Sequence, residues 1–357
     1  MDMPGMGSTA LPPLTLGSAL GTWHLVPVAD VIVALAALGY LHRAYRTLPR
    51  AGVRWPAGRT ASFLGALLVA AVAVQSGIDV YGGTLFWMHM VEHLVLIMVV
   101  PALFILGQPI RLLSTGADKS GADTIATRTE SALRSRVASV LTFPLVGLAL
   151  YAAILVGTHL TGFMQQMLTH LWLHDLEIAL YLVGGYLYFL PLLGHEPLRR
   201  ELSYPLRVFV LLMGMTADTV VGVMLMMASS EPFPAYAAQN RGWGPGLLSD
   251  IHTGGGIMWV IGDGLMFAIT VLVVAQWMGD TERQNDTGRW LESARRSSLA
   301  GLGVDLRDES AEPGKSTVDN QGAGGPADQI DNDDEALAAY NRMLARLSQL
   351  DKDQPAR

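Results

Sequence analysis

Long runs of apolar residues are the feature of this 357-residue sequence that most restricts its fold. A transmembrane helix needs about 20 consecutive, mostly apolar residues. About seven runs of this kind occur, at 23–41, 61–79, 85–107, 140–159, 171–193, 207–229 and 252–278. Since 51% of all residues are hydrophobic and only 15% are charged, a soluble domain of this length could not bury the apolar surface. The sequence therefore predicts an all-α fold: a polytopic bundle of about seven transmembrane helices in the bacterial plasma membrane.

Basic residues predict the orientation of these spans. The loop after the first span holds five arginines and no acid, and the loops after the third and fifth spans are also basic. The N-terminal tail and the remaining loops between spans hold a single basic residue, Arg241. The positive-inside rule then places the N-terminus outside and the C-terminus in the cytoplasm. No basic stretch precedes the first apolar run, so we expect no cleaved signal peptide.

The composition divides the chain into four segments. An extracytoplasmic, Met-containing tail (1–22) precedes the transmembrane domain (23–279), and an acidic linker (280–332) without apolar periodicity is expected to be disordered. The last segment (333–357) is predicted to be a short cytoplasmic helix or a loose tail. As a helix, it would dock on a cytoplasmic partner through one apolar face. The net charge of −7 is concentrated near this end, which argues against nucleic-acid binding.

The histidines gather on the predicted outer side of the bundle. Seven of the nine fall there: His24, His89, His93, His159, His170, His174 and His252. His89 and His93 are four residues apart, as are His170 and His174, so each pair shares one face of a helix. Hydrogen bonding inside the bundle would explain a single pair. Two pairs at the same depth, with three further histidines, favour a metal site.

Methionines and acids near these histidines suggest which metal binds. Imidazole suits Zn, Cu, Fe and Ni, whereas thioethers select Cu(I). The chain has 17 methionines and no cysteine. We therefore predict copper, with auxiliary capture by outer methionines, although packing is the alternative for any one of them; the six are Met3, Met6, Met88, Met90, Met164 and Met167. Glu92, Glu177 and Asp250 are predicted to orient the histidine ligands.

Two acids lie inside predicted spans, Asp218 in the sixth and Asp263 in the seventh. An ionisable group inside a bilayer is costly unless it faces the bundle interior and is paired, so such residues are functional candidates. The alternative is that Asp218 hydrogen-bonds a neighbouring helix and holds the bundle together. We include Asp218 among the candidate residues that support the metal site.

Four motifs resemble those of a known family. Met-His-Met-Val-Glu-His-Leu at 88–94, leading to Leu-Gly-Gln-Pro at 106–109, is similar to the third-span motif of the Bacillus-type cytochrome c oxidase assembly factor CtaG. The same holds for Thr-His-Leu at 158–160, His-Leu-Trp-Leu-His at 170–174 and Asp-Ile-His-Thr-Gly-Gly-Gly at 250–256. The resemblance covers most of residues 20–280. It implies a role in maturing a haem-copper oxidase, by supplying copper to an oxidase subunit during a transient contact on the outer side.

The first hypothesis is therefore a copper-binding assembly factor that is not an enzyme. Its ligands would be the two histidine pairs and His252, with His24 and His159 gating or supplementing the site. Two alternatives stay open. A seven-span zinc-dependent membrane hydrolase would use Glu92 or Asp218 as general base, and a copper transporter would need a polar path across the membrane through Asp218 and Asp263. Haem is disfavoured because the paired histidines crowd the space that a porphyrin needs.

Overall fold

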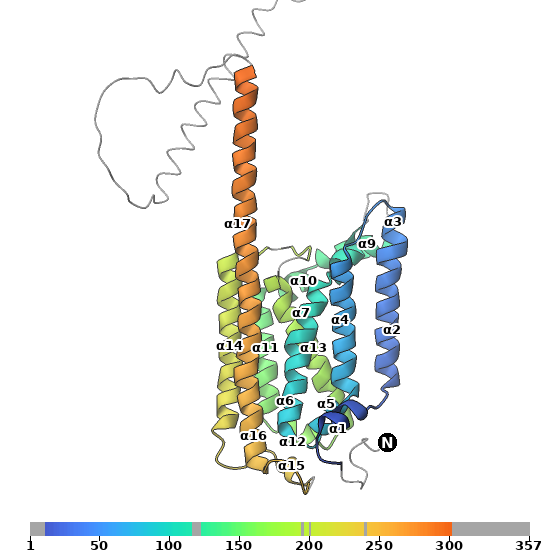
Figure 1. Cartoon of the computed structure of the whole chain (residues 1–357), viewed down its shortest axis with the longest axis vertical. Coiled ribbons are helices and arrows are strands. Elements are labelled where there is room, and N and C mark those ends of the chain that lie inside the picture. Colours follow the sequence, from blue (N-terminus) through green and yellow to red (C-terminus); the bar gives the residue numbers. More distant parts are fainter. Residues whose placement is uncertain (1–10, 116–122, 194–195, 200, 239–240, 302–357) are drawn as a thin grey trace, which may run out of the picture. The chain divides into compact units, whose positions relative to one another are not determined.

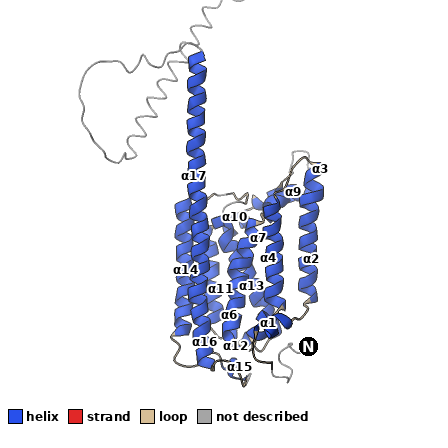
Figure 2. Ribbon diagram, in the orientation of Figure 1, coloured by secondary structure: helices blue, strands red, loops and turns tan. Residues whose placement is uncertain are grey.

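The computed structural model describes residues 11–115, 123–193, 196–199, 201–238 and 241–301, and the regular elements in these ranges are helical (Figure 2). The predicted all-α fold is confirmed. The helices are α1 (Leu16–Gly21), α2 (Pro27–His42), α3 (Leu48–Arg50), α4 (Ala57–Gln75), α5 (Gly77–Gly82), α6 (Phe86–Leu94), α7 (Val100–Leu106), α8 (Pro109–Ser114), α9 (Thr124–Leu133), α10 (Arg136–Leu141), α11 (Pro144–His159), α12 (Phe163–Met167), α13 (Leu171–Leu193), α14 (Tyr204–Met226), α15 (Pro234–Ala238), α16 (Leu247–Gly256) and α17 (Gly262–Gly301). Three π-helical segments continue helices: η1 (Arg43–Thr47), η2 (Val95–Val99) and η3 (Ile257–Ile261).

Several of these helices are long and apolar enough to cross a bilayer, which indicates a multi-pass membrane protein. Within the described residues there are six: Pro27–Arg50, Ala57–Gln75, Phe86–Ser114, Trp172–Leu193, Tyr204–Met226 and Leu247–Thr281. The expected seventh span, 140–159, is shorter, since α11 has only 16 residues. Pro144 begins α11 and has no N–H to donate, and Phe143 before it is extended, so α10 cannot run on into α11.

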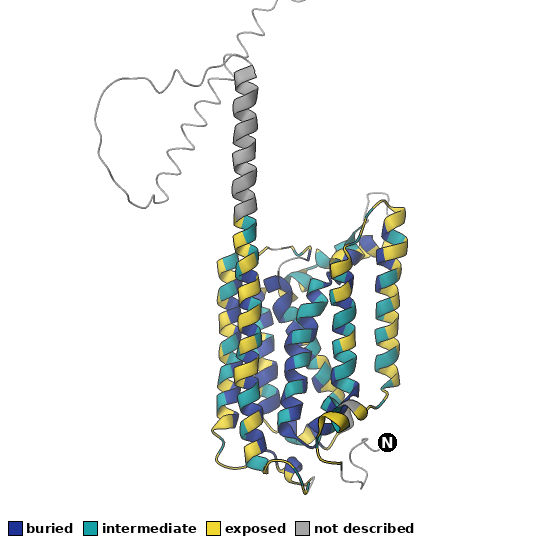
Figure 3. Ribbon diagram, in the orientation of Figure 1, coloured by how far each residue is buried: buried dark blue, intermediate teal, exposed yellow. Residues whose placement is uncertain are grey.

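The long helices run side by side, and short helices lie at both ends of the bundle (Figure 1). At one end lie α1, α5, α12 and α15, and at the other lie α3, α9 and α10. The chain divides into two compact units, residues 1–286 and 287–357, and the bundle belongs to the first. Figure 3 shows that α6 and α13 are largely buried, whereas α2 is mostly exposed or half-buried.

Glycines let neighbouring helices approach closely in the core. A Cβ atom on Gly185 would lie 1.9 Å from the carbonyl oxygen of Ile97, so α13 packs directly on η2. A Cβ atom on Gly222 would lie 2.9 Å from the carbonyl oxygen of Gly255, so α14 packs equally closely on α16. The contact at Gly185 holds α13 against the helix that carries His89 and His93.

Some predicted features fall at the limits of the described chain. Helix α17 runs to Gly301, so the first part of the expected disordered linker is helical; its sequence there holds four Arg, two Leu and two Ala, which favour helix. The C-terminal segment 333–357 lies outside the described residues. So do Met3 and Met6 of the N-terminal tail.

Candidate metal centre

Helix α6 positions the first histidine pair, and its start is fixed by an acid from another helix. The Asp250 carboxylate of α16 accepts hydrogen bonds from the backbone N–H groups of Phe86 and Trp87, both at 3.0 Å. The Arg241 guanidinium lies 2.9 Å from the same carboxylate. A carboxylate at a helix N-terminus satisfies free N–H groups and matches the helix dipole. Asp250 thus orients the whole helix rather than a single imidazole.

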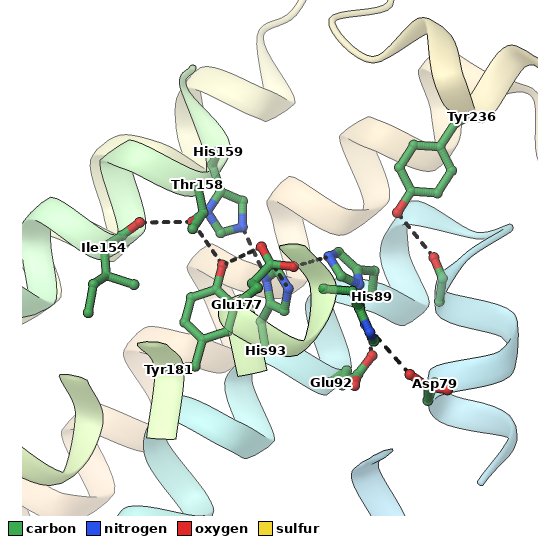
Figure 4. Close-up of polar contacts among 12 residues, drawn as sticks. Asp79, His89, Glu92, His93, Ile154, Thr158, His159, Glu177, Tyr181 and Tyr236 are labelled. Carbon is green, nitrogen blue, oxygen red and sulfur yellow. Dashed lines mark hydrogen bonds and ion pairs between the residues drawn. The ribbon is translucent and has the colours of Figure 1, made fainter. Parts of the chain in front are cut away.

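Three buried side chains form the inner group, defined here as His89, His93 and Glu177 (Figure 4). The Nε2 atom of His89 lies 3.5 Å from Glu177 Oε2, and the Nε2 atom of His93 lies 3.6 Å from Glu177 Oε1. One ligand atom from each residue lies within 4.8 Å of the others. None of the three residues is more than 5% exposed. Two imidazoles and a carboxylate facing one point make a plausible metal-binding set.

A second set, the outer group, consists of His89, Glu92 and His174, and its ligand atoms also lie within 4.8 Å of one another. The Nδ1 atom of His89 lies 3.8 Å from Glu92 Oε2, on the side of the ring away from Glu177. His89 therefore belongs to both groups and faces each with a different nitrogen. Glu92 and Glu177 were predicted to orient the histidine ligands. Here each carboxylate is itself a member of a candidate metal group, Glu177 of the inner group and Glu92 of the outer group.

Hydrogen bonds determine which nitrogen of a neutral His93 carries the proton. The Nδ1 atom of His159 lies 3.0 Å from the carbonyl oxygen of Leu155, which can only accept, so this nitrogen is the donor. In a neutral ring the Nε2 atom of His159 is then an acceptor, and it lies 3.2 Å from His93 Nδ1, which must donate. A neutral His93 consequently turns a free lone pair on Nε2 toward Glu177. A lone pair facing a carboxylate is repulsive unless a proton or a metal cation lies between the two atoms.

Tyr181 holds the other side of the inner group. Its hydroxyl lies 3.2 Å from Glu177 Oε1 and 2.8 Å from Thr158 Oγ1 (Figure 4). Yet several buried polar atoms of the two groups have no hydrogen-bond partner: His89 Nε2, His93 Nε2, Glu177 Oε2 and both carboxylate oxygens of Glu92. A buried unpartnered polar atom costs roughly 1–3 kcal/mol. Because these atoms converge on two points, a bound cation at each would satisfy them together.

Asp79, on α5, extends the cluster and was not among the predicted residues. Its Oδ1 atom lies 3.6 Å from His174 Nε2, and its Oδ2 atom lies 3.4 Å from His24 Nε2. Burial, together with the nearby Asp175 carboxylate, raises the pKa of Asp79 to about 7. In the sequence, Asp79 is the last residue of the predicted second span, 61–79. An acid at the same depth as the histidines was the signal that could have identified it.

Two predicted ligands lie in neither group. His170 is exposed and precedes α13, and its Nδ1 atom lies 3.1 Å from the carbonyl oxygen of Gln166. His252 is half-buried on α16, and its Nε2 atom lies 2.8 Å from the carbonyl oxygen of Ala228. Since α13 begins after His170, this histidine and His174 do not share a helical face as their spacing predicted.

The described outer methionines pack in apolar surroundings. Met90, Met164 and Met167 are buried in the main core, and Met88 is buried in a smaller cluster with Tyr81 and Leu85. Packing accounts for these positions. Their role as auxiliary copper ligands stays a prediction.

The two intramembrane acids are separate from the histidine groups. Asp218 is fully buried and accepts a hydrogen bond from the Tyr151 hydroxyl at 2.9 Å, which links α14 to α11. Asp263 accepts a hydrogen bond from the Thr219 hydroxyl at 2.7 Å. These contacts join helices within the bundle, in agreement with the packing interpretation of Asp218.

Comparison with known proteins gives the chain its family. The model of the cytochrome c oxidase caa3 assembly factor family, Caa3_CtaG, matches residues 38–280. Uncharacterized protein Mb0105 of Mycobacterium bovis is 30% identical over 278 residues, which is 76% of this chain and 42% of that protein. Uncharacterized protein ML1998 of Mycobacterium leprae is 26% identical over 265 residues, 73% of this chain and 40% of that protein. The chain thus spans about two fifths of the length of these curated relatives, and no solved structure matches it. Because the family match covers more than half of its length, the chain belongs to the cytochrome c oxidase caa3 assembly factor family.

Proposed function

We propose that this protein binds copper on the outer side of the bacterial plasma membrane and supplies it to a subunit of a caa3-type oxidase during assembly. The observation that carries the proposal is the inner group. His89, His93 and Glu177 are buried, they converge on one point, and three of their polar atoms there lack a hydrogen-bond partner. When His93 is neutral, its hydrogen bond to His159 leaves the lone pair on Nε2 directed at this point, as metal ligation requires.

Family membership supports copper over other metals. Two imidazoles and a carboxylate suit zinc and iron as well as copper. A factor that assembles a haem-copper oxidase has copper as the natural cargo, and the metal is then a passenger rather than a resident cofactor. Binding and release are sufficient for this role. A membrane site near one end of the bundle would let the ion pass sideways to a partner in the same bilayer.

The test is elemental analysis of the full-length protein beside two variants. The first, His89→Ala with His93→Ala, removes both α6 ligands. The second, His252→Ala, removes a histidine of the same end of the bundle that lies in neither group. We expect near-stoichiometric copper in the wild type and in His252→Ala, and loss of copper in the double variant. Equal expression and equal thermal unfolding of the samples would exclude misfolding as the cause.

Two results would overturn the proposal. Zinc in place of copper would favour the membrane-hydrolase alternative, in which Glu92 is positioned beside a metal-bound water. Absence of metal from the wild type after copper loading would mean that the cluster is a polar packing network.

A further inference from the structure

The buried groups need a route by which an ion can reach them. His89, Glu92, His93 and Glu177 are between 1% and 5% exposed, so both groups are nearly closed to the surface. Toward the end of the bundle where α1 and α5 lie, the exposed fraction of the side chains rises. It is 19% for His174, 15% for Asp79 and 21% for His24.

These three more exposed residues continue the series of ligand atoms outward. His174 belongs to the outer group, and its Nε2 atom lies 3.6 Å from Oδ1 of Asp79. The other oxygen of Asp79 lies 3.4 Å from His24 Nε2. Asp79 thus faces one histidine with each oxygen. The series of ligand atoms thus runs from His24 through Asp79, His174 and His89 to Glu177. Each residue has a ligand atom within 4.8 Å of one on the next residue. Asp79 and His89 use a different atom for each neighbour.

The segment that carries His24 is held against α5. A Cβ atom on Gly77 would lie 2.5 Å from the carbonyl oxygen of Ala19, so α1 packs directly on α5. The backbone N–H of His24 donates to the carbonyl oxygen of Gln75 at 3.0 Å. Farther along, the Tyr81 hydroxyl donates to the carbonyl oxygen of Pro12 at 3.1 Å. This N-terminal segment therefore covers the outer side of the cluster and contributes one imidazole to it.

His24 also has unused ligand capacity. Its Nε2 atom faces Asp79, while its Nδ1 atom is buried without a hydrogen-bond partner. The contact with Asp79 accounts for one edge of the ring and leaves the buried Nδ1 atom unexplained. Nδ1 is therefore suited to brief coordination of an ion, because no hydrogen bond to this nitrogen has to be broken first.

We infer that His24 and Asp79 form the entry path by which the metal cation reaches the buried groups, passing through His174. The inference rests on the proposed function, since it assumes a metal cargo. It assigns to Asp79 the transfer of the ion between two histidines, and to His24 the first capture. Neither residue is needed to retain the ion once it lies between His89, His93 and Glu177.

The experiment measures loading rate and final copper content separately. Metal-free, full-length protein in lipid nanodiscs is mixed with the Cu(I)–bicinchoninate complex, and the loss of the chelator colour is followed in a stopped-flow instrument. Asp79→Asn keeps the size of the side chain and removes its charge. We expect loading of this variant to be slower by roughly tenfold or more, since charges that attract an incoming ion raise association rates by about that factor. Its final copper content should equal that of the wild type.

Two further variants make the test specific. His24→Ala should also load slowly and reach full occupancy. Asp175→Asn removes an exposed negative charge close to Asp79 without removing a link between histidines, so it measures the general attraction of the ion and should slow loading much less than Asp79→Asn does. Wild-type loading rates in both Asp79→Asn and His24→Ala would overturn the entry path and leave the binding site intact. Loss of bound copper at equilibrium in Asp79→Asn would also overturn it, because Asp79 would then be a resident ligand. A wild type that retains no copper would instead overturn the proposed function.

Discussion

Replacing Glu177 by Gln is the sharpest single test of the inner group. The change removes one negative charge and almost no volume. Glu177 lies 3.5 Å from His89 Nε2 and 3.6 Å from His93 Nε2, so an ion ligated by both imidazoles would be in contact with this carboxylate. The glutamine carbonyl oxygen can still accept the hydrogen bond that Tyr181 donates, and the packing of α13 on η2 is untouched.

The expected loss of affinity follows from the charge that is removed. Two unit charges 4 Å apart interact with about 4 kcal/mol at an effective dielectric constant of about 20. The glutamine dipole recovers part of this, so the loss is roughly 3–4 kcal/mol, or a rise in Kd of about 10²–10³. The assay is competition for Cu(I) against a chelator of known affinity, with the protein in nanodiscs.

Glu130→Gln is the matched control for this measurement. Glu130 is a partly exposed carboxylate at the other end of the bundle, paired at 3.4 Å with the exposed Arg134. Its replacement should leave the Kd for copper unchanged. Equal affinities for Glu177→Gln and the wild type, with copper still bound, would refute the assignment of Glu177 to the metal site.

The other predictions concern the supports of the bundle. Asp250→Ala should lower the thermal unfolding midpoint by several degrees and reduce copper content, because it frees two N–H groups of α6 and removes the carboxylate that neutralises the Arg241 guanidinium. Among the described residues, Arg241 then keeps only its hydrogen bonds to the carbonyl oxygens of Thr84 and Pro245. Removing one partner of a buried ion pair costs about 3–5 kcal/mol, and an unchanged midpoint would contradict this. Burial raises the pKa of Glu196 to about 7 from an ordinary value of 4.5, so the folded protein binds this proton more tightly than the unfolded chain does. The resulting stabilisation is complete below about pH 4.5 and is lost as the pH rises through 7. Glu196→Gln should therefore reduce the fall in the unfolding midpoint between pH 5 and pH 8, and parallel pH profiles of the two proteins would contradict the reasoning.

Local spacing predicted the part of the site that lies on one helix. The separation of four residues between His89 and His93 places both rings on the buried face of α6, where their centroids are 3.9 Å apart. The same rule failed for His170, because it assumes that the helix already includes both residues, and α13 starts one residue later. Apolar composition does not locate the first residue of a helix to within one or two positions. It therefore could not show on which side of the helix start His170 lies.

The spacing of residues along the sequence could not predict which helices are in contact. Glu177 meets His89 and His93 because Gly185, two turns further along α13, permits direct contact with η2, and nothing in the sequence states which helices are neighbours. Asp79 was missed for a related reason. Apolar composition extended the second span through it, whereas the helix ends at Gln75 and a separate short helix, α5, turns Asp79 toward His174.

The short helix α11 has a consequence for the membrane around it. At about 1.5 Å per residue, its 16 residues reach about 24 Å, which is less than the roughly 30 Å thickness of a bilayer's hydrocarbon layer. Leu145 and Val156 on this helix are exposed, so lipid acyl chains lie against it. A span this short is matched either by local thinning of the bilayer or by association with another membrane helix, and the mismatch costs a fraction of a kcal/mol per Å. A membrane partner with short spans of its own would reduce this mismatch by packing there, beside the helix that ends in His159.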